Sequence, residues 1–204
     1  MKTTRNDILI ILPLSVLIIL GMIMVASSSI YVADEMTSNP FHFAQRQIIF
    51  IAIGLISMIG FLLLPSNVLY RTDWIFMILS ILLLIVLFIP DVGTSVNGSI
   101  RWIRLGPINI QPSEICKFSL ILYISGYSVR RMSEIDSVRS FLKPLALLFI
   151  ISVLIMGQPD LGSTAIVCIL VVGILFYAGI SFFQLGLLIL LIILLGYLAI
   201  TTSP

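Results

Sequence analysis

The sequence predicts an all-α membrane protein, a polytopic helix bundle with about seven transmembrane helices. Hydrophobic residues make up 60% of the 204-residue chain and charged residues only 10%, whereas soluble domains carry about 25% charged residues. The apolar residues also form long runs without the alternation expected of membrane-spanning strands. Helices are then the spanning form that satisfies every backbone hydrogen bond inside the bilayer.

Apolar runs place the expected helices along the whole chain. The first run follows Lys2 and Arg5, as in a signal peptide, but it is too long for the apolar core of one and is interpreted as an uncleaved span. The fourth run is the least hydrophobic because it carries Glu114 and Lys117, so we expect it to line a cavity. The expected helices lie near residues 8–31, 47–64, 74–90, 112–129, 142–157, 163–180 and 183–201.

Basic residues predict the orientation, because cytoplasmic loops carry an excess of Lys and Arg. A cytoplasmic N-terminus places seven of the 11 basic residues inside: Lys2, Arg5, Arg71, Arg130, Arg131, Arg139 and Lys143. Three then lie outside, namely Arg46, Arg101 and Arg104, while Lys117 lies in the membrane. The connections 32–46, 90–111 and 158–162 are therefore expected on the outer side. The net charge of +2 is too small to indicate nucleic-acid binding.

The outer connection before the fourth helix contains the polar sequence NGSIRWIRLGPINIQ. Trp102 fits an aromatic belt at the outer membrane interface. Arg101 and Arg104 lie close to it, and their planar guanidinium groups suit phosphate oxygens. The phosphate could belong to a specific substrate or to ordinary anionic lipids, and the sequence leaves both interpretations open.

Glu114 and Lys117 lie at the start of the fourth helix, just after Pro112. A spacing of three residues places the carboxylate and the ammonium group on one helix face. Ionisable groups are costly inside a membrane, so the pair indicates either a structural ion pair between helices or a cavity for a polar or anionic head group.

Asp160 and His42 are the remaining polar candidates. Asp160, in GQPDLGS, either caps the helix that begins at Leu161 or combines that role with a place in the outer cavity. There its carboxylate could be a base, a metal ligand or the partner of an arginine. His42, in NPFHFAQRQ, fits an interfacial turn better than a proton relay. Cys116 and Cys168 have no metal-ligand spacing and are expected to be small buried hydrophobic residues.

These segments resemble motifs of the SEDS family, named for shape, elongation, division and sporulation. The segment NGSIRWIRLGPINIQPSEICK is similar to the family pattern NG-x-x-RWI-x-LG…QPSE-x-x-K, and GQPDLGSTAIV is similar to its QPDLGT segment. NPFHFAQRQ and YSVRR…FLKPL resemble the cell-division branch more closely than the elongation branch. The resemblance covers essentially residues 1–204 as one transmembrane domain, and implies the N-terminal part of a ten-span fold, truncated before its large outer loop and last three spans.

The resemblance implies a peptidoglycan glycosyltransferase that polymerises lipid II during cell division. An acceptor sugar hydroxyl would attack the anomeric carbon of a donor sugar, and undecaprenyl pyrophosphate would leave. The implied substrate-binding residues are Arg101, Trp102, Arg104, Gln111, Glu114, Lys117 and Asp160. Lys117 and the two arginines would contact the pyrophosphate or head group, Glu114 would orient Lys117, and Asp160 would line or brace the cavity. The implied catalytic aspartate lies beyond Pro204, so no residue is assigned as catalytic and this chain alone is expected to be inactive.

The resemblance also implies partners and a location. The partners are lipid II, a class B penicillin-binding protein and other divisome proteins, and the location is the bacterial inner membrane at the division septum. No cofactor or metal is implied, although a divalent cation stays open. Two other functions also stay open. A lipid II flippase would need a route from the inner side, and an ion-coupled transporter would use Glu114 and Lys117, although no repeated half is visible.

Overall fold

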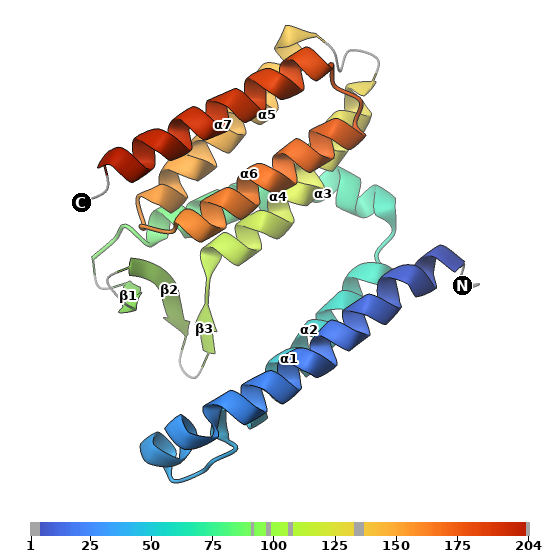
Figure 1. Cartoon of the computed structure of the whole chain (residues 1–204). Coiled ribbons are helices and arrows are strands. Elements are labelled where there is room, and N and C mark those ends of the chain that lie inside the picture. The colour runs from blue at the N-terminus through green and yellow to red at the C-terminus, as the bar shows by residue number, and fades with distance from the viewer. Residues whose placement is uncertain (1–4, 91, 97–98, 106–107, 133–136, 203–204) are drawn as a thin grey trace. The chain divides into compact units, whose positions relative to one another are not determined.

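The computed structural model describes residues 5–202, apart from residues 91, 97–98, 106–107 and 133–136. The described residues form seven helices and one small sheet, which confirms the predicted all-α membrane class (Figure 1). By internal contacts the chain divides into two compact units, Met1–Pro65 and Ser66–Pro204.

The first unit is a hairpin of two long helices, α1 (Arg5–Thr37) and α2 (His42–Leu63). In the turn between them, Asn39 Oδ1 accepts a hydrogen bond from the Phe41 amide at 3.0 Å. Both helices are long and apolar enough to cross a membrane, and their apolar side chains remain largely exposed within the unit, as lipid-facing residues would be. The start expected for α2, near residue 47, is too late, because the polar residues from His42 onward already form its first turns.

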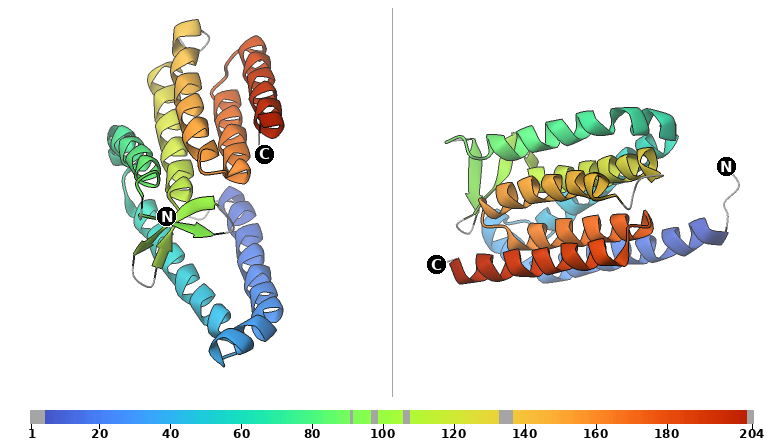
Figure 2. Two further views of the ribbon diagram at one scale, coloured as in Figure 1. Left: turned by 90° about the vertical axis from the view of Figure 1, so that its left-hand side faces the viewer. Right: turned by 90° about the horizontal axis from the view of Figure 1, so that it is seen from above.

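The second unit places its helices roughly along one direction (Figure 2). These helices are α3 (Ser66–Val86), α4 (Pro112–Arg130), α5 (Val138–Met156), α6 (Leu161–Tyr177) and α7 (Phe182–Thr202). The fourth helix lies in the middle, because α4 packs against both α3 and α6, and α6 in turn contacts α5 and α7. Fully buried Leu120 and Ile124 of α4 belong to the same apolar core as Val167 and Val171 of α6.

The low hydrophobicity expected for the fourth helix is also observed. Among the described residues, α1, α2 and α3 are long and apolar enough to span a membrane, and α5, α6 and α7 contain shorter apolar helices. Helix α4 belongs to neither set. Its buried residues include Ser113, Ser119 and Ser128, so much of its polar surface faces other helices. This arrangement agrees with a helix that contacts protein rather than lipid.

Helix α3 begins earlier than the sequence predicts. The prediction near residues 74–90 starts where the apolar run starts, and that boundary is wrong, because the helix already begins at Ser66. Arg71 and Asp73 therefore lie inside the helix and not in a connection. The helix tolerates Asp73, whose side chain is only 1% exposed, because that carboxylate is paired with Arg130 of α4.

A three-stranded antiparallel sheet, which the sequence analysis does not predict, fills much of the connection before α4. Its strands β1 (Gly93–Val96), β2 (Ser99–Leu105) and β3 (Ile108–Ile110) pair in chain order. Figure 1 shows the sheet near the end of the bundle where α4 begins, and β2 contacts α4. The pairing of β1 with β2 shifts by one residue between Thr94 and Ser95, so β2 carries a bulge at Arg101.

Candidate functional site

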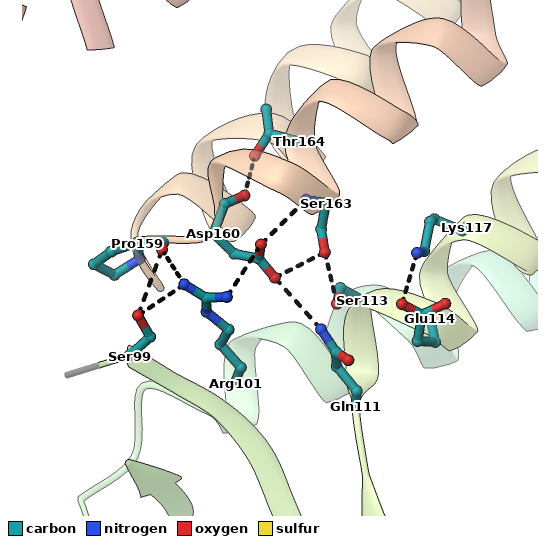
Figure 3. A network of polar contacts seen from close by, with 10 residues as sticks. All are labelled: Ser99, Arg101, Gln111, Ser113, Glu114, Lys117, Pro159, Asp160, Ser163 and Thr164. Atoms are coloured by element: carbon teal, nitrogen blue, oxygen red, sulfur yellow. Dashed lines mark hydrogen bonds and ion pairs between the residues drawn. The ribbon is translucent and has the colours of Figure 1, made fainter. Parts of the chain in front are cut away.

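The site is organised around Asp160, the residue that precedes α6. Its Oδ1 accepts a hydrogen bond from the Ser163 amide at 3.1 Å, and its Oδ2 accepts one from Ser163 Oγ at 2.7 Å. The first bond is a standard helix N-cap, which satisfies an amide that has no partner within the helix. Asp160 is only 4% exposed. The cap predicted for α6 is therefore present, and it fixes the carboxylate at the mouth of the helix (Figure 3).

Arg101 of β2 connects the sheet to this carboxylate. Its Nη1 lies 3.5 Å from Asp160 Oδ1, and its Nη2 donates to the Pro159 carbonyl at 2.7 Å and to Ser99 Oγ at 2.9 Å. Figure 3 shows Ser99 and Arg101 directed from the strand toward the 159–160 segment. Of the alternatives left open for Asp160, the structure combines the helix cap with the arginine partner.

Gln111 brings α4 into the same network. It is the residue before Pro112, where α4 begins, and its Nε2 donates to Asp160 Oδ2 at 3.4 Å. Two residues further along the chain, Ser113 Oγ lies 3.5 Å from Ser163 Oγ. The network thus joins β2, the start of α4 and the start of α6, three segments that are distant in sequence. Several donors compete for Asp160, so its oxygens are occupied and its geometry fits a bracing role.

Glu114 and Lys117 form the expected ion pair on α4, with Lys117 Nζ 2.6 Å from Glu114 Oε1. The side chain of Glu114 is 58% exposed and that of Lys117 only 14%. Figure 3 shows the pair on α4 beside Ser113, and none of the bonds drawn there joins it to Asp160. Both partners lie on α4, so the pair does not hold two helices together. It keeps a shielded ammonium group near the Asp160 network.

Trp102 and Arg104 are placed differently from Arg101. Arg101 lies at a β-bulge, because Thr94 of β1 pairs with Trp102 and the next residue, Ser95, pairs with Ile100. Trp102 is half-buried and pairs with Thr94 of β1, whereas Arg104 is exposed and pairs with Asn109 of β3. The structure therefore brings Arg101, Gln111 and Asp160 together and leaves the Glu114–Lys117 pair beside them. Among the described residues, no side-chain hydrogen bond or ion pair joins Trp102 or Arg104 to the network.

A pocket of about 340 Å³ adjoins the network. Its lining is mostly apolar and comes from the segment that follows α3 and from β1 and β2, and it also includes Gln158 and Pro159. Gln158 is buried and donates to the Leu84 carbonyl at 3.3 Å, which fixes the α5–α6 connection to α3. The carbonyl of Pro159 is the group that Arg101 binds. The same short segment therefore lines an apolar pocket and anchors a cation.

The sequence analysis does not identify Ser99, Ser163 or the Pro159 carbonyl as parts of this site. Two local signals were available. Ser99 precedes Arg101 by two residues, the spacing that places side chains on one face of a strand. Ser163 follows Asp160 by three residues, the position whose amide a helix cap binds. Within the described part of the chain, no group of three or more His, Cys, Asp or Glu side chains could hold a metal ion.

Comparison with protein families and curated proteins gives a consistent result. The model of the FtsW/RodA/SpoVE family, described as cell cycle proteins, matches residues 7–203. A probable peptidoglycan glycosyltransferase FtsW of Alkalilimnicola ehrlichii is 39% identical over 91% of this chain and 46% of its own length. The protein of the same name from Allochromatium vinosum is 41% identical over 81% of this chain and 42% of its own length. The chain thus spans about half the length of these relatives.

Solved structures confirm the fold. The crystal structure of the Thermus thermophilus rod shape determining protein RodA matches 86% of this chain and 58% of its own chain, with a TM-score of 0.65 and 23% identity. A chain from a structure titled "Structural coordination of polymerization and crosslinking by a peptidoglycan synthase complex" matches 89% of this chain and 53% of its own chain. Its TM-score is 0.63 and its sequence identity is 24%. The chain therefore shares its fold with these two solved structures.

Proposed function

The chain belongs to the FtsW/RodA/SpoVE family, and from this premise we propose that its Asp160 network and Lys117 hold the lipid II head group for glycan polymerisation during cell division. The name shared by the FtsW relatives, peptidoglycan glycosyltransferase, supports the reaction class. The apolar helices and the family make it a multi-pass membrane protein. We further propose that the membrane is the bacterial inner membrane at the septum, with the N-terminus in the cytoplasm.

One observation carries this proposal: Arg101 is held in place before any ligand arrives. Its guanidinium group contacts Asp160, Ser99 and the Pro159 carbonyl, yet its side chain remains 35% exposed. A cation that is already ordered loses little conformational freedom when it binds an anion. Lys117, held by Glu114, and the exposed Arg104 add positive charge in the same part of the chain. Such groups suit the pyrophosphate of a lipid-linked sugar.

The chemistry of transfer divides into two tasks. The acceptor hydroxyl bonds to the anomeric carbon of the donor, the bond from that carbon to the pyrophosphate oxygen breaks, and the hydroxyl proton passes to a base. Positive charge stabilises the departing pyrophosphate, and we assign that task to Arg101 and Lys117. Asp160 is a poor choice for the base, because it is buried and both oxygens already accept hydrogen bonds. The residues of this chain therefore bind and orient, and the base is not assigned among them.

Binding of lipid II tests the proposal directly. The purified 204-residue chain in neutral detergent would be titrated with fluorescent lipid II, alongside Arg101→Gln and Lys117→Gln. Each substitution removes one charge-assisted contact, so we expect about a tenfold or greater loss of affinity. Arg46→Gln, which removes a cation that lies over the Phe50 ring of α2, is the matched control and should bind like the unmodified chain. Equal affinity for all four proteins would reject the assignment.

An activity assay separates polymerisation from the alternatives. The buried, hydrogen-bonded Asp160 is not expected to act as the base, so we expect the 204-residue chain alone to bind lipid II without forming glycan strands. Glycan product from this chain would contradict that expectation. A full-length FtsW relative should polymerise external lipid II and lose this activity when the lysine that matches Lys117 is replaced by alanine. Translocation without polymerisation would instead favour a flippase, and proton-driven transport abolished by Glu114→Gln would favour a transporter.

We also propose that a transpeptidase of the class B penicillin-binding type associates with the protein. The support is the similar chain from the study whose title joins polymerization with crosslinking.

The proposed orientation in the membrane is testable with a periplasmic reporter enzyme. A fusion within the 97–98 connection should be active and one within the 133–136 connection inactive, because the basic residues predict opposite sides for them. The reverse pattern would invert the proposed topology and place Arg101 in the cytoplasm.

A further inference from the structure

A second polar pocket lies at the far end of α4 from Asp160. It has a volume of about 530 Å³ and opens where α3 begins, α4 ends and α5 begins. The 19 residues of α4 place its two ends about 28 Å apart, at about 1.5 Å per residue. This pocket is therefore separate from the Asp160 network. By the count of basic residues, its end of the bundle is the one predicted to face the cytoplasm.

The lining of this pocket is strongly cationic. It includes Arg71, Arg130, Arg131 and Lys143, and Asp73 is the single carboxylate among the lining residues that the structure describes. Asp73 is accounted for by Arg130, because Arg130 Nη1 lies 2.7 Å from Asp73 Oδ2. Apart from that pair, Arg71 and Lys143 bring two positive charges to the lining of the cavity. Like charges held together repel one another, so an anion in the cavity would lower the energy of the arrangement.

Arg130 is held in place by several contacts. Besides the ion pair, its Nη1 donates to the Tyr70 carbonyl at 3.1 Å, and its guanidinium carbon lies 5.0 Å from the centre of the Tyr70 ring. Arg71 and Lys143 differ, because both are exposed and neither has an ion-pair or hydrogen-bond partner among the residues that the structure describes. The pocket thus combines one fixed cation with two cations that are available to a ligand.

Aromatic rings complete the lining. Four tyrosine and tryptophan side chains, among them Trp74 and Tyr127, line the same pocket. Such rings favour the level of lipid head groups, where one part of the side chain is apolar and the other is wet. The volume falls within the range of ordinary small-molecule sites, about 300–1,000 Å³. Basic pockets between membrane helices on the cytoplasmic side are suited to the phosphates of anionic lipids.

We propose that this pocket is a binding site for a phosphate-bearing anion, with Arg71 and Lys143 as its principal contacts. Two sources share this chemistry, the head group of an anionic phospholipid in the inner leaflet and a soluble phosphate compound in the cytoplasm. The site is independent of the proposed head-group site near Arg101, because it uses different residues at the other end of α4.

The test uses the 204-residue chain in neutral detergent and native mass spectrometry to count bound lipids. Phosphatidylglycerol should be retained more strongly than phosphatidylcholine. The double variant Arg71→Gln/Lys143→Gln should weaken binding of phosphatidylglycerol by about 30-fold, because each basic residue near an anionic lipid contributes on the order of 1 kcal/mol. Arg46→Gln, which removes a cation that does not line the pocket, should leave it unchanged. Both substituted residues are exposed, so the fold should survive, and circular dichroism checks this.

A competition experiment identifies the source of the phosphate. If millimolar glycerol 1-phosphate displaces phosphatidylglycerol, the site recognises the phosphate without the acyl chains, and a soluble ligand is supported. If the lipid binds and glycerol 1-phosphate does not compete, a lipid head group is supported. Equal retention of phosphatidylglycerol and phosphatidylcholine would overturn the proposal. So would a double variant that binds like Arg46→Gln, since the cations would then serve only to orient the protein in the membrane.

Discussion

A buried aspartate paired with an arginine lies near each end of α4, but the two aspartates differ in the number of hydrogen bonds that they accept from other groups. Asp160 is 4% exposed and accepts bonds from Ser163 and Gln111, while Arg101 lies 3.5 Å away. Asp73 is 1% exposed, and its Oδ2 faces Arg130 at 2.7 Å with no hydrogen bond from any other described group. One carboxylate is satisfied without its arginine and the other depends on it.

This difference indicates whether each ion pair contributes mainly to stability or to ligand binding. Removing one partner of a buried ion pair is costly when the remaining charge has no other partner. At the Asp73 end the arginine therefore serves mainly stability. At the Asp160 end other donors satisfy the carboxylate, so Arg101 can respond to a ligand at little cost to the fold. Substitutions at the two ends should separate these roles.

The largest effect is expected for Arg130→Ala. It leaves Asp73 buried and unpaired, which should lower the free energy of unfolding by about 3 kcal/mol. Unfolding by denaturant titration in mixed micelles would measure this. The double variant Asp73→Asn/Arg130→Ala should recover much of the loss, because the buried charge is gone. Arg71→Ala, an exposed neighbour on α3, is the control and should change stability little. A neutral result for Arg130→Ala would remove the contrast between the two ends.

Gly126→Ala should have the next largest effect. A Cβ atom at Gly126 would overlap Asp73 Oδ2 and would lie 3.2 Å from Arg130 Nη1, so the ion pair would have to move. Overpacking of this kind costs about 2 kcal/mol. Gly173→Ala on α6 is a matched control, because nothing lies within 4 Å of the added atom. It should be neutral or stabilise by up to about 1 kcal/mol through helix propensity. Equal melting temperatures for both variants would show that α3 and α4 separate easily here.

A smaller effect is expected at the Asp160 end. Asp160→Ala removes the N-cap of α6 together with the partner of Arg101, and loss of such a cap costs about 1 kcal/mol. Asp160→Asn keeps an oxygen that can accept the Ser163 amide, so it should retain most of the stability. Thermal unfolding followed by circular dichroism would compare the two. If Asn is as destabilising as Ala, the charge contributes more than the cap.

The smallest effect on stability is expected for Arg101→Gln. Asp160 keeps its bonds from Ser163 and Gln111, and a partly exposed ion pair contributes under about 1 kcal/mol. The same variant should nevertheless lose about tenfold or more in affinity for lipid II, as proposed above. Stability and binding measured on one preparation would test both statements. A large loss of stability with unchanged binding would make Arg101 a structural residue like Arg130.

The sequence alone identifies several residues that meet in the Asp160 network. Arg101, Gln111 and Asp160 all lie in motifs that resemble the family, and the structure brings them together. The Glu114–Lys117 pair followed from helical spacing alone. The substrate contacts assigned to these residues, and to Trp102 and Arg104, remain predictions. The sheet positions of Trp102 and Arg104 depend on β2, a strand that the hydropathy pattern does not reveal.

The start of α3, near Asp73, is a boundary that the sequence pattern predicts wrongly. A carboxylate next to an apolar run marks a boundary in a hydropathy profile, so the helix was expected to begin after it. In the structure α3 begins at Ser66, because Arg130 from α4 compensates the charge. A signal was present, since an arginine at the end of the next predicted helix lies on the same predicted side of the membrane. Only packing of α3 against α4 decides that the two meet.

The sequence by itself determined the membrane class, the approximate spans, the family and the residues that carry charge, because these depend on local composition and spacing. The tertiary structure decided which charges meet. It placed Asp160 with Arg101 and Asp73 with Arg130, and it kept Lys117 with its own helix neighbour Glu114. The physical reason is that burial of a charge depends on partners from distant segments, and those partners are fixed only when α4 packs between α3 and α6.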